Sequence, residues 1–217
     1  MRDLYYDQLG AIVGELVAMT RTVREASDNA TEALLSADAR LAEQVIAEDA
    51  RIDRGREQVE ERSFELLARQ QPVAGDLRML VAALRMVGDL ERMGDLAVHI
   101  AKVARLRFPE KAVPPVLEDT IRAMAGVADE MVEAAAVVIE SRDVEAAHAL
   151  EAQDEEMDRL RRSLFEVLLS DDWTGGVEPA IDIALLGRYY ERIADHAVSM
   201  ARRVVYLVTG ENPVHVS

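Results

Sequence analysis

Apolar residues recur at alternating three- and four-residue steps along two long stretches, and this period restricts the fold more than any other feature. The first series is Leu9, Ile12, Leu16, Met19, Val23, Ala26 and Ala30. The second series is Leu117, Ile121, Met124, Ala128, Met131, Ala135 and Val138. Such spacing places apolar side chains on one narrow stripe of an α-helix, as in the seams of helical bundles. Each stretch must therefore bury its stripe against other helices.

The rest of the chain also favours helices. Strong helix formers fill most windows, and the 217 residues include only 11 Gly and 6 Pro. Pro72 ends one helix, because the residue before a proline is displaced from the α conformation. Besides the second apolar stretch, which ends before Asp143, we expect helices at about residues 4–35, 39–70, 73–106, 144–170 and 177–208. The predicted fold is all-α, with two tandem antiparallel three-helix bundles related by an internal repeat.

A proline-rich segment separates the two halves. It reads Phe108-Pro109-Glu110-Lys111-Ala112-Val113-Pro114-Pro115 and cannot continue a helix. We therefore expect a first three-helix repeat over residues 1–107 and a linker over 108–115. A second repeat is expected over residues 116–210, followed by a loose tail over 211–217.

A charged motif near the end of each half supports the repeat. Glu91-Arg92-Met93-Gly94-Asp95 recurs one hundred positions later as Glu191-Arg192-Ile193-Ala194-Asp195. In a chain with 41 acidic residues, carboxylate pairs at i and i+4 arise often by chance. Two copies in matching positions indicate an internal repeat instead.

Each half carries a second acidic pair, one helix before the motif. Residues at i and i+4 share a helix face, so Glu191 and Asp195 share a stripe with Val177, as Glu91 and Asp95 do with Leu77. Four carboxylates within the apolar faces of neighbouring helices must become protonated, bind cations or stay hydrated. An all-oxygen site suits magnesium, manganese or iron. The predicted metal-ligating residues are Asp49, Asp53, Glu91 and Asp95 in the first half, and Asp154, Asp158, Glu191 and Asp195 in the second.

Composition disfavours several classes of partner and activity. A net charge of −16 repels nucleic acid and anionic lipid headgroups, so we expect neither as a partner. The absence of cysteine excludes disulfides and thiolate metal ligands. No apolar run is long enough to span a membrane, and the N-terminus lacks the apolar core of a signal peptide. No nucleotide-binding loop or hydrolase motif occurs, so the chain is predicted not to be an enzyme.

Two alternatives remain open on residue patterns alone. The acidic pairs could be solvated faces and salt bridges of a metal-free helical scaffold. They could also belong to a carboxylate-bridged di-metal enzyme of the ferritin-like type. That site needs two Glu-x-x-His elements on separate helices, and the chain has one, Glu145-Ala146-Ala147-His148.

Three segments resemble the PhoU family. They are Gln70-Gln71-Pro72-Val73-Ala74-Gly75-Asp76-Leu77-Arg78, Asp89-Leu90-Glu91-Arg92-Met93-Gly94-Asp95 and Tyr190-Glu191-Arg192-Ile193-Ala194-Asp195-His196. The resemblance covers nearly the whole chain, including both repeats. The segment Leu185-Leu186-Gly187-Arg188-Tyr189-Tyr190-Glu191-Arg192 is similar to versions from high-GC Gram-positive bacteria. The chain departs from the pattern at Ser199, and it has Tyr189 where the first repeat has Asp89.

The resemblance implies a cytoplasmic homodimer, peripheral to the inner face of the membrane. It implies a negative regulator of phosphate uptake and of the phosphate-starvation response. Such a protein acts as an adaptor between the ATPase subunit of the phosphate ABC transporter and a phosphate-sensing histidine kinase. The resemblance also implies iron, zinc or other divalent metal ions on acidic motifs, which fall here on the same eight carboxylates.

Overall fold

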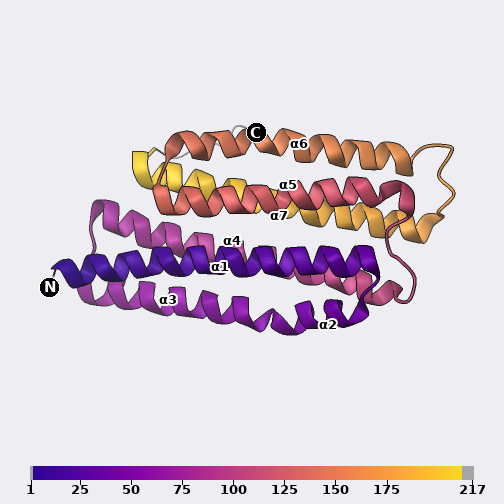
Figure 1. The fold of residues 1–217 in the computed structure, drawn as a ribbon. Helices are drawn as coiled ribbons and strands as arrows, with labels where there is room; N and C mark the ends of the chain where they lie inside the picture. Colours follow the sequence, from indigo (N-terminus) through magenta and orange to yellow (C-terminus); the bar gives the residue numbers. More distant parts are fainter. Residues whose placement is uncertain (1, 212–217) are drawn as a thin grey trace.

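The computed structural model describes residues 2–211, which form seven α-helices and no β-strand (Figure 1). The helices are α1 (Arg2–Ser36), α2 (Ala39–Glu48), α3 (Ala50–Gln70), α4 (Ala74–Arg107), α5 (Pro115–Ser141), α6 (Val144–Leu168) and α7 (Val177–Thr209). The all-α prediction is confirmed. Beyond Glu211, the predicted loose tail lies outside the described residues.

Local signals fix most helix ends near their predicted positions. The Asp38 side chain accepts a hydrogen bond from the Leu41 amide at 2.9 Å and caps α2. Asp143 caps α6 in the same way. Pro115 begins α5 at a position where its missing N–H is harmless. Gly210 ends α7 with a left-handed φ of 75°, which glycine adopts without strain.

The predicted helix over residues 39–70 is wrong in one respect, because it breaks at Asp49 into α2 and α3. There the carbonyl of Asp49 accepts from the amides of Ile52 and Asp53, at 2.9 and 3.2 Å. This tightened turn lies beside Gly94 of α4. A Cβ atom on Gly94 would stand 2.7 Å from Cδ1 of Ile52. Close packing on α4 therefore accompanies the bend, which apolar periodicity alone does not reveal.

The helices form two antiparallel bundles stacked side by side (Figure 1). The first contains α1, α2–α3 and α4, and the second contains α5, α6 and α7. Across the interface α1 packs against α5, and α4 packs against α7. Among the described residues, α2–α3 and α6 contact only helices of their own bundle. These outer helices thus lie on opposite sides of the molecule.

One hydrophobic core runs through both bundles. Hydrogen bonds also join the two bundles. Arg24 of α1 donates to both carboxylate oxygens of Asp129 of α5, at 2.6 and 2.8 Å. The fully buried hydroxyl of Tyr190 lies 2.9 Å from that of Thr31. The two bundles therefore share interior surface, and separating them would expose apolar and polar groups together.

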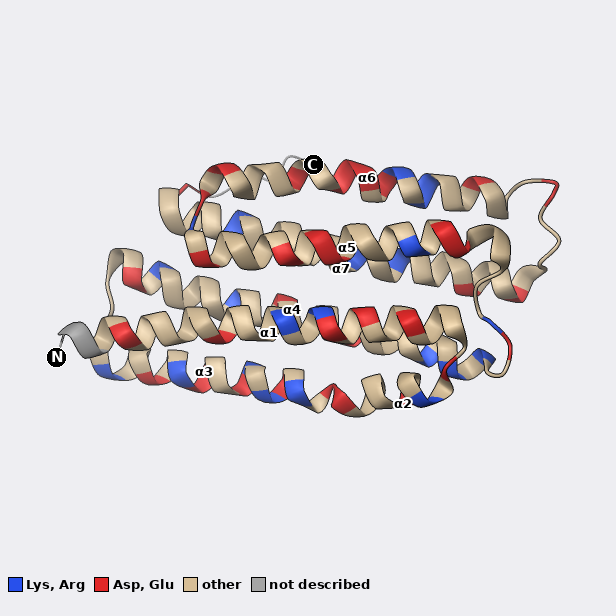
Figure 2. Cartoon of the chain, in the orientation of Figure 1, with Lys and Arg blue, Asp and Glu red and all other residues tan. Residues whose placement is uncertain are grey.

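Charged residues are distributed over both bundles rather than gathered at one end. Figure 2 shows acidic segments along α1, α3, α5 and α6, with basic segments between them. None of the helices in the described part of the chain is long and apolar enough to cross a membrane.

Candidate functional site

The first acidic patch consists of Asp49, Asp53, Glu91 and Asp95, at the bend between α2 and α3 and on α4. Gly94 allows α3 to approach α4 closely here, since a Cβ on it would lie 2.7 Å from Cδ1 of Ile52, and Oδ1 of Asp49 lies 3.5 Å from the same position. Desolvation and then the charges of Asp53 and Asp95 raise the pKa of Asp49, while Lys102 opposes them. The fold thus brings together residues from both predicted pairs.

Arginine competes for part of this patch. Arg92 donates a hydrogen bond to Asp95 at 3.2 Å and lies 3.7 Å from the carboxylate of Glu91. Its side chain is 65% exposed, so these contacts are screened by water. The first acidic patch remains open to solvent and accessible to a cation.

The second acidic patch consists of Asp154, Asp158, Glu191 and Asp195, on α6 and α7. Desolvation and then the charges of Asp195 and Asp158 raise the pKa of Asp154, with a smaller contribution from Glu191. Arg202 lowers it. The pKa of Asp195 is raised as well, first by desolvation and then by Glu191. Here the other three predicted carboxylates all act on Asp154.

Glu191 makes the second patch chemically different from the first. It is buried, and its Oε1 lies 2.6 Å from Arg188 Nη1. Its Oε2 lies 3.2 Å from Arg161 Nε, but neither of these two atoms forms a well-aligned hydrogen bond. Two guanidinium groups therefore already neutralise this carboxylate. The two halves repeat the acidic pattern without repeating its electrostatics.

The donor type of both patches fits a hard cation, because every candidate ligand is a carboxylate oxygen. Desolvation, and then the charge of neighbouring carboxylates, raises the pKa values of Asp49 and Asp154, and a bound cation would relieve the second of these effects. Yet among residues 2–211 no three carboxylate or histidine groups converge tightly enough to hold a metal ion. Metal ligation by the eight predicted residues therefore stays a prediction.

The Glu-x-x-His element does not face a bundle core. Glu145 and His148 lie in the first turns of α6, and both are exposed. His99 is also exposed, with its ring 5.5 Å from the ring of Tyr189. This arrangement offers little support to the di-metal enzyme alternative.

Sequence reasoning missed a buried polar network between α4 and α7. Asp89 is 8% exposed, and its carboxylate accepts from Arg203 Nε at 2.9 Å. Its other oxygen lies 3.0 Å from His196 Nδ1. Helical spacing between the apolar residues Met86 and Met93 could have placed Asp89 in the core. No local pattern could have identified Arg203, far along the chain, as its partner.

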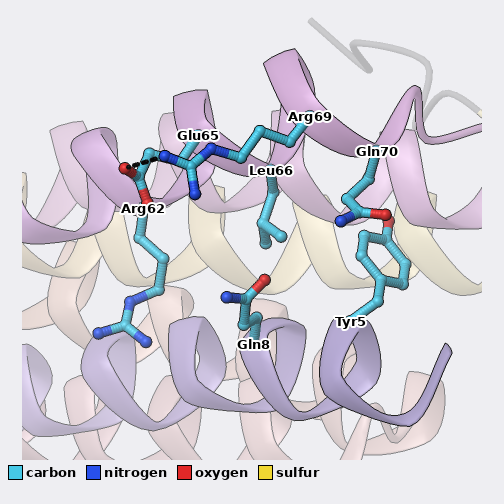
Figure 3. Close-up of a pocket in the computed structure, with 7 residues that line it drawn as sticks. All are labelled: Tyr5, Gln8, Arg62, Glu65, Leu66, Arg69 and Gln70. Carbon is cyan, nitrogen blue, oxygen red and sulfur yellow. Dashed lines mark hydrogen bonds and ion pairs between the residues drawn. The ribbon is translucent and has the colours of Figure 1, made fainter. Parts of the chain in front are cut away.

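A small cavity of about 140 Å³ lies between α1 and α3 (Figure 3). Its two arginines already have acidic partners, since Arg62 lies 2.9 Å from Glu15 and Arg69 3.4 Å from Glu65. Burial and then the neighbouring Asp76 carboxylate raise the pKa of the Tyr5 hydroxyl, which also lines the cavity. The cavity therefore offers little uncompensated positive charge to an anion such as phosphate.

Comparison with known proteins identifies one family across both bundles. The model of the PhoU domain matches residues 16–104 and 121–204. The "phosphate-specific transport system accessory protein PhoU homolog 2" of Mycobacterium tuberculosis is 46% identical over 98% of this chain and 100% of its own length. Homolog 1 of Mycobacterium leprae is 45% identical over 98% of this chain and 96% of its own length.

Solved structures agree with the sequence relatives. The crystal structure of PhoU from Pseudomonas aeruginosa superimposes with a TM-score of 0.86 at 30% identity, covering 95% of this chain and all of that one. The phosphate transport system regulatory protein PhoU from Streptococcus pneumoniae also gives a TM-score of 0.86, at 26% identity. It covers 96% of this chain and 98% of its own.

Proposed function

This chain belongs to the PhoU family, and from this premise we propose that it is an accessory regulatory protein of a phosphate-specific transport system. The observation that carries the proposal is the family match to both repeats. A mycobacterial relative named as such an accessory protein is 46% identical over 98% of the chain. Function in this class rests on binding partners, so the proposal requires no active site.

The finer proposal is negative regulation by an adaptor in the cytoplasm, peripheral to the membrane. One surface contacts the ATPase subunit of the phosphate ABC transporter, and another contacts the phosphate-sensing histidine kinase. The arrangement of the outer helices supports two separate contact surfaces, because α2–α3 and α6 lie on opposite sides of the molecule (Figure 1). The two acidic patches differ in charge, because Arg161 and Arg188 neutralise Glu191 in the second patch. Patches of different charge are compatible with two different partner proteins.

Deletion of the gene tests the regulatory proposal. Phosphate-uptake genes should become derepressed in high phosphate, and the wild-type gene should restore repression. The variant Asp119→Ala, on an exposed position of α5, serves as a control that should complement fully. Continued repression in the deletion strain would show that this chain does not regulate phosphate uptake.

Cation binding at the acidic patches is a further part of the proposal. The first acidic patch is the stronger candidate, because its carboxylates are less neutralised by arginine than Glu191 is. Metal analysis of protein purified without chelators should detect bound iron, manganese, zinc or magnesium. Added Mn²⁺ should raise Tm in the wild type and less in Asp49→Asn/Asp53→Asn, because ligands that bind only the folded state stabilise it.

Three results together would remove metal from the proposal. They are no co-purifying metal, no Mn²⁺-dependent rise in Tm, and intact regulation by Glu91→Ala/Asp95→Ala. The proposed homodimer is tested separately by sedimentation velocity, where a single species of monomer mass over a wide concentration range would contradict it.

A further inference from the structure

An apolar groove of about 560 Å³ opens where α6 ends and α7 begins. Its lining includes Phe165 from the end of α6, Leu169 and Trp173 from the connecting segment, and Val177 and Ile181 from α7. Leu169 is 82% exposed, Val177 77% and Ile181 55%. Val177, which the sequence pattern places on one stripe with Glu191 and Asp195, is thus exposed at the start of α7. Several large apolar side chains exposed together mark an interaction surface more often than a single exposed apolar side chain does.

The groove is a departure from the internal repeat. In the first bundle, residues 71–73 alone connect α3 to α4, whereas residues 169–176 connect α6 to α7. The longer connection supplies Trp173, which forms one side of the groove. Because the shorter link closes the same kind of bundle, the extra length is not needed to build the fold.

The connection holds the Trp173 ring in place. Its Nε1–H donates to the carbonyl oxygen of Gly176 at 2.9 Å. Gly175 lies directly beside the ring, and a Cβ atom on it would approach the ring to 2.5 Å. Gly176 has a left-handed φ of 81°, a conformation that glycine tolerates best. The indole is thus positioned by its own loop before any partner arrives.

The segment that forms the groove is acidic, and the nearby Arg161 lies with its guanidinium 5.5 Å from the centroid of the Phe165 ring. Residues 165–184 contain five carboxylates and no Lys, Arg or His, and Figure 2 shows the α6–α7 link with acidic segments and no basic one. Glu178 and Asp182 pair with Arg107, both at 2.5 Å. Within the described part of the chain, the other three form no ion pair: Glu166, Asp171 and Asp172. An occupant with positive charge beside an apolar face would complement this rim.

We propose that this groove binds an amphipathic helix of a partner protein, with its apolar face between α6 and α7 and basic residues beside Glu166, Asp171 and Asp172. Helices commonly dock in apolar grooves through side chains spaced three and four residues apart. Anionic lipid is a poor match, because its headgroups would face the acidic rim. A second copy of this chain, with net charge −16, is a poor match for the same reason. The inference adds to the proposed function and does not rest on it.

Trp173 makes the test direct, because it is the only tryptophan in the chain. The probe is a Trp-free synthetic helix of about 15 residues, about 22 Å long. It carries leucines on one face and lysines on the flanks. A matched peptide keeps the leucines and replaces every lysine by glutamate. The basic peptide should change the Trp173 emission saturably, and added salt should weaken its binding. The acidic peptide should leave the emission unchanged.

Variants distinguish groove binding from non-specific attraction. Ile181→Glu should weaken the basic peptide about tenfold or more, as for a central contact residue. Phe64→Glu, on an exposed side chain of α3, is the matched control and should bind as the wild type does. Asp171→Lys/Asp172→Lys should weaken the basic peptide and allow the acidic one to bind. Asp171 and Asp172 are both exposed, so circular dichroism of this double variant should show an unchanged fold.

Three outcomes would overturn the proposal. Equal binding of both peptides, or no effect of Ile181→Glu, would show that the groove does not select a basic amphipathic helix. A Trp173 response to phosphatidylglycerol vesicles but to neither peptide would identify a lipid-facing surface instead. Dissociation of a dimer by Ile181→Glu and not by Phe64→Glu would identify a second copy as the occupant.

Discussion

Replacing Asp89 by alanine removes the centre of the polar network between α4 and α7. The side chain of Asp89 is 10% exposed, and those of His196 and Arg203 are 15% and 27% exposed. Both partners come from α7, so the carboxylate connects one bundle to the other. Loss of Asp89 leaves a guanidinium without a counter-charge, and the atom His196 Nε2 is already buried without a hydrogen-bond partner.

The stability lost in Asp89→Ala can be worked out from these contacts. A hydrogen bond to a charged group contributes about 1.5–3 kcal/mol, so the two bonds to the Asp89 carboxylate contribute about 3–6 kcal/mol together. Partial exposure of Arg203 lets water replace part of its lost interaction, which places the total near the lower end of the sum. Asp89→Ala should therefore lower the free energy of unfolding by about 3 kcal/mol, and Tm by about 6–12 °C for a chain of this size.

Urea unfolding followed by far-UV circular dichroism measures this loss. The midpoint should fall while the slope with urea stays constant, because the folded surface is little changed. Asp89→Asn separates charge from shape, since it keeps the size and one acceptor but turns an amide toward Arg203. Asp119→Ala, at an exposed position of α5, is the control and should change stability by at most about 0.5 kcal/mol.

Equal urea midpoints for Asp89→Ala and Asp119→Ala would contradict this prediction. That result would mean that water or rearranged side chains satisfy Arg203 and His196 equally well. A double-mutant cycle with Arg203→Met extends the test, because the two changes should then be clearly non-additive.

Three other substitutions probe the packing and the acidic patches. Tyr190→Phe should cost about 1 kcal/mol in urea unfolding, because it removes the buried hydroxyl contact with Thr31; a similar loss in the Thr31→Val background would refute the coupling. Gly94→Ala should cost about 1–3 kcal/mol, since its Cβ would press on buried Ile52, and Ile52→Val should recover part of the loss. Asp154→Asn should raise Tm near pH 7, with the gain shrinking as pH falls. The folded-state pKa of Asp154 is raised, so the stability from its protonated form is present at acid pH and lost as pH rises through that pKa. A gain independent of pH would exclude this explanation.

The helices and their ends were largely predictable because their signals are local. Apolar side chains at three- and four-residue steps, such as Leu117, Ile121 and Met124, are fully buried in the structure. Asp143 acts as the predicted break between two helices and caps α6, whereas Pro115, which was predicted to lie in the linker, begins α5. Capping and periodicity depend only on near neighbours along the chain, so a single sequence carries them.

The acidic patches were predictable in membership but not in chemistry. Spacing placed Glu191 beside Asp195 on one helix face, and Asp154 on the neighbouring helix interacts with both. Whether each carboxylate is free depends on arginines elsewhere in the bundle. Arg161, on α6, approaches Glu191 on α7 and so distinguishes the second patch from the first.

By itself the sequence determined the all-α class, the repeat and the family, since each depends on residue types at short, regular spacings. Tertiary structure alone decided the bend at Asp49, the pairing of Asp89 with Arg203 and the exposure of Val177. Periodicity specifies which face of a helix is apolar, but it does not specify what that face meets. Contacts between residues distant in the chain depend on how the two bundles pack, and that packing is a property of the whole molecule.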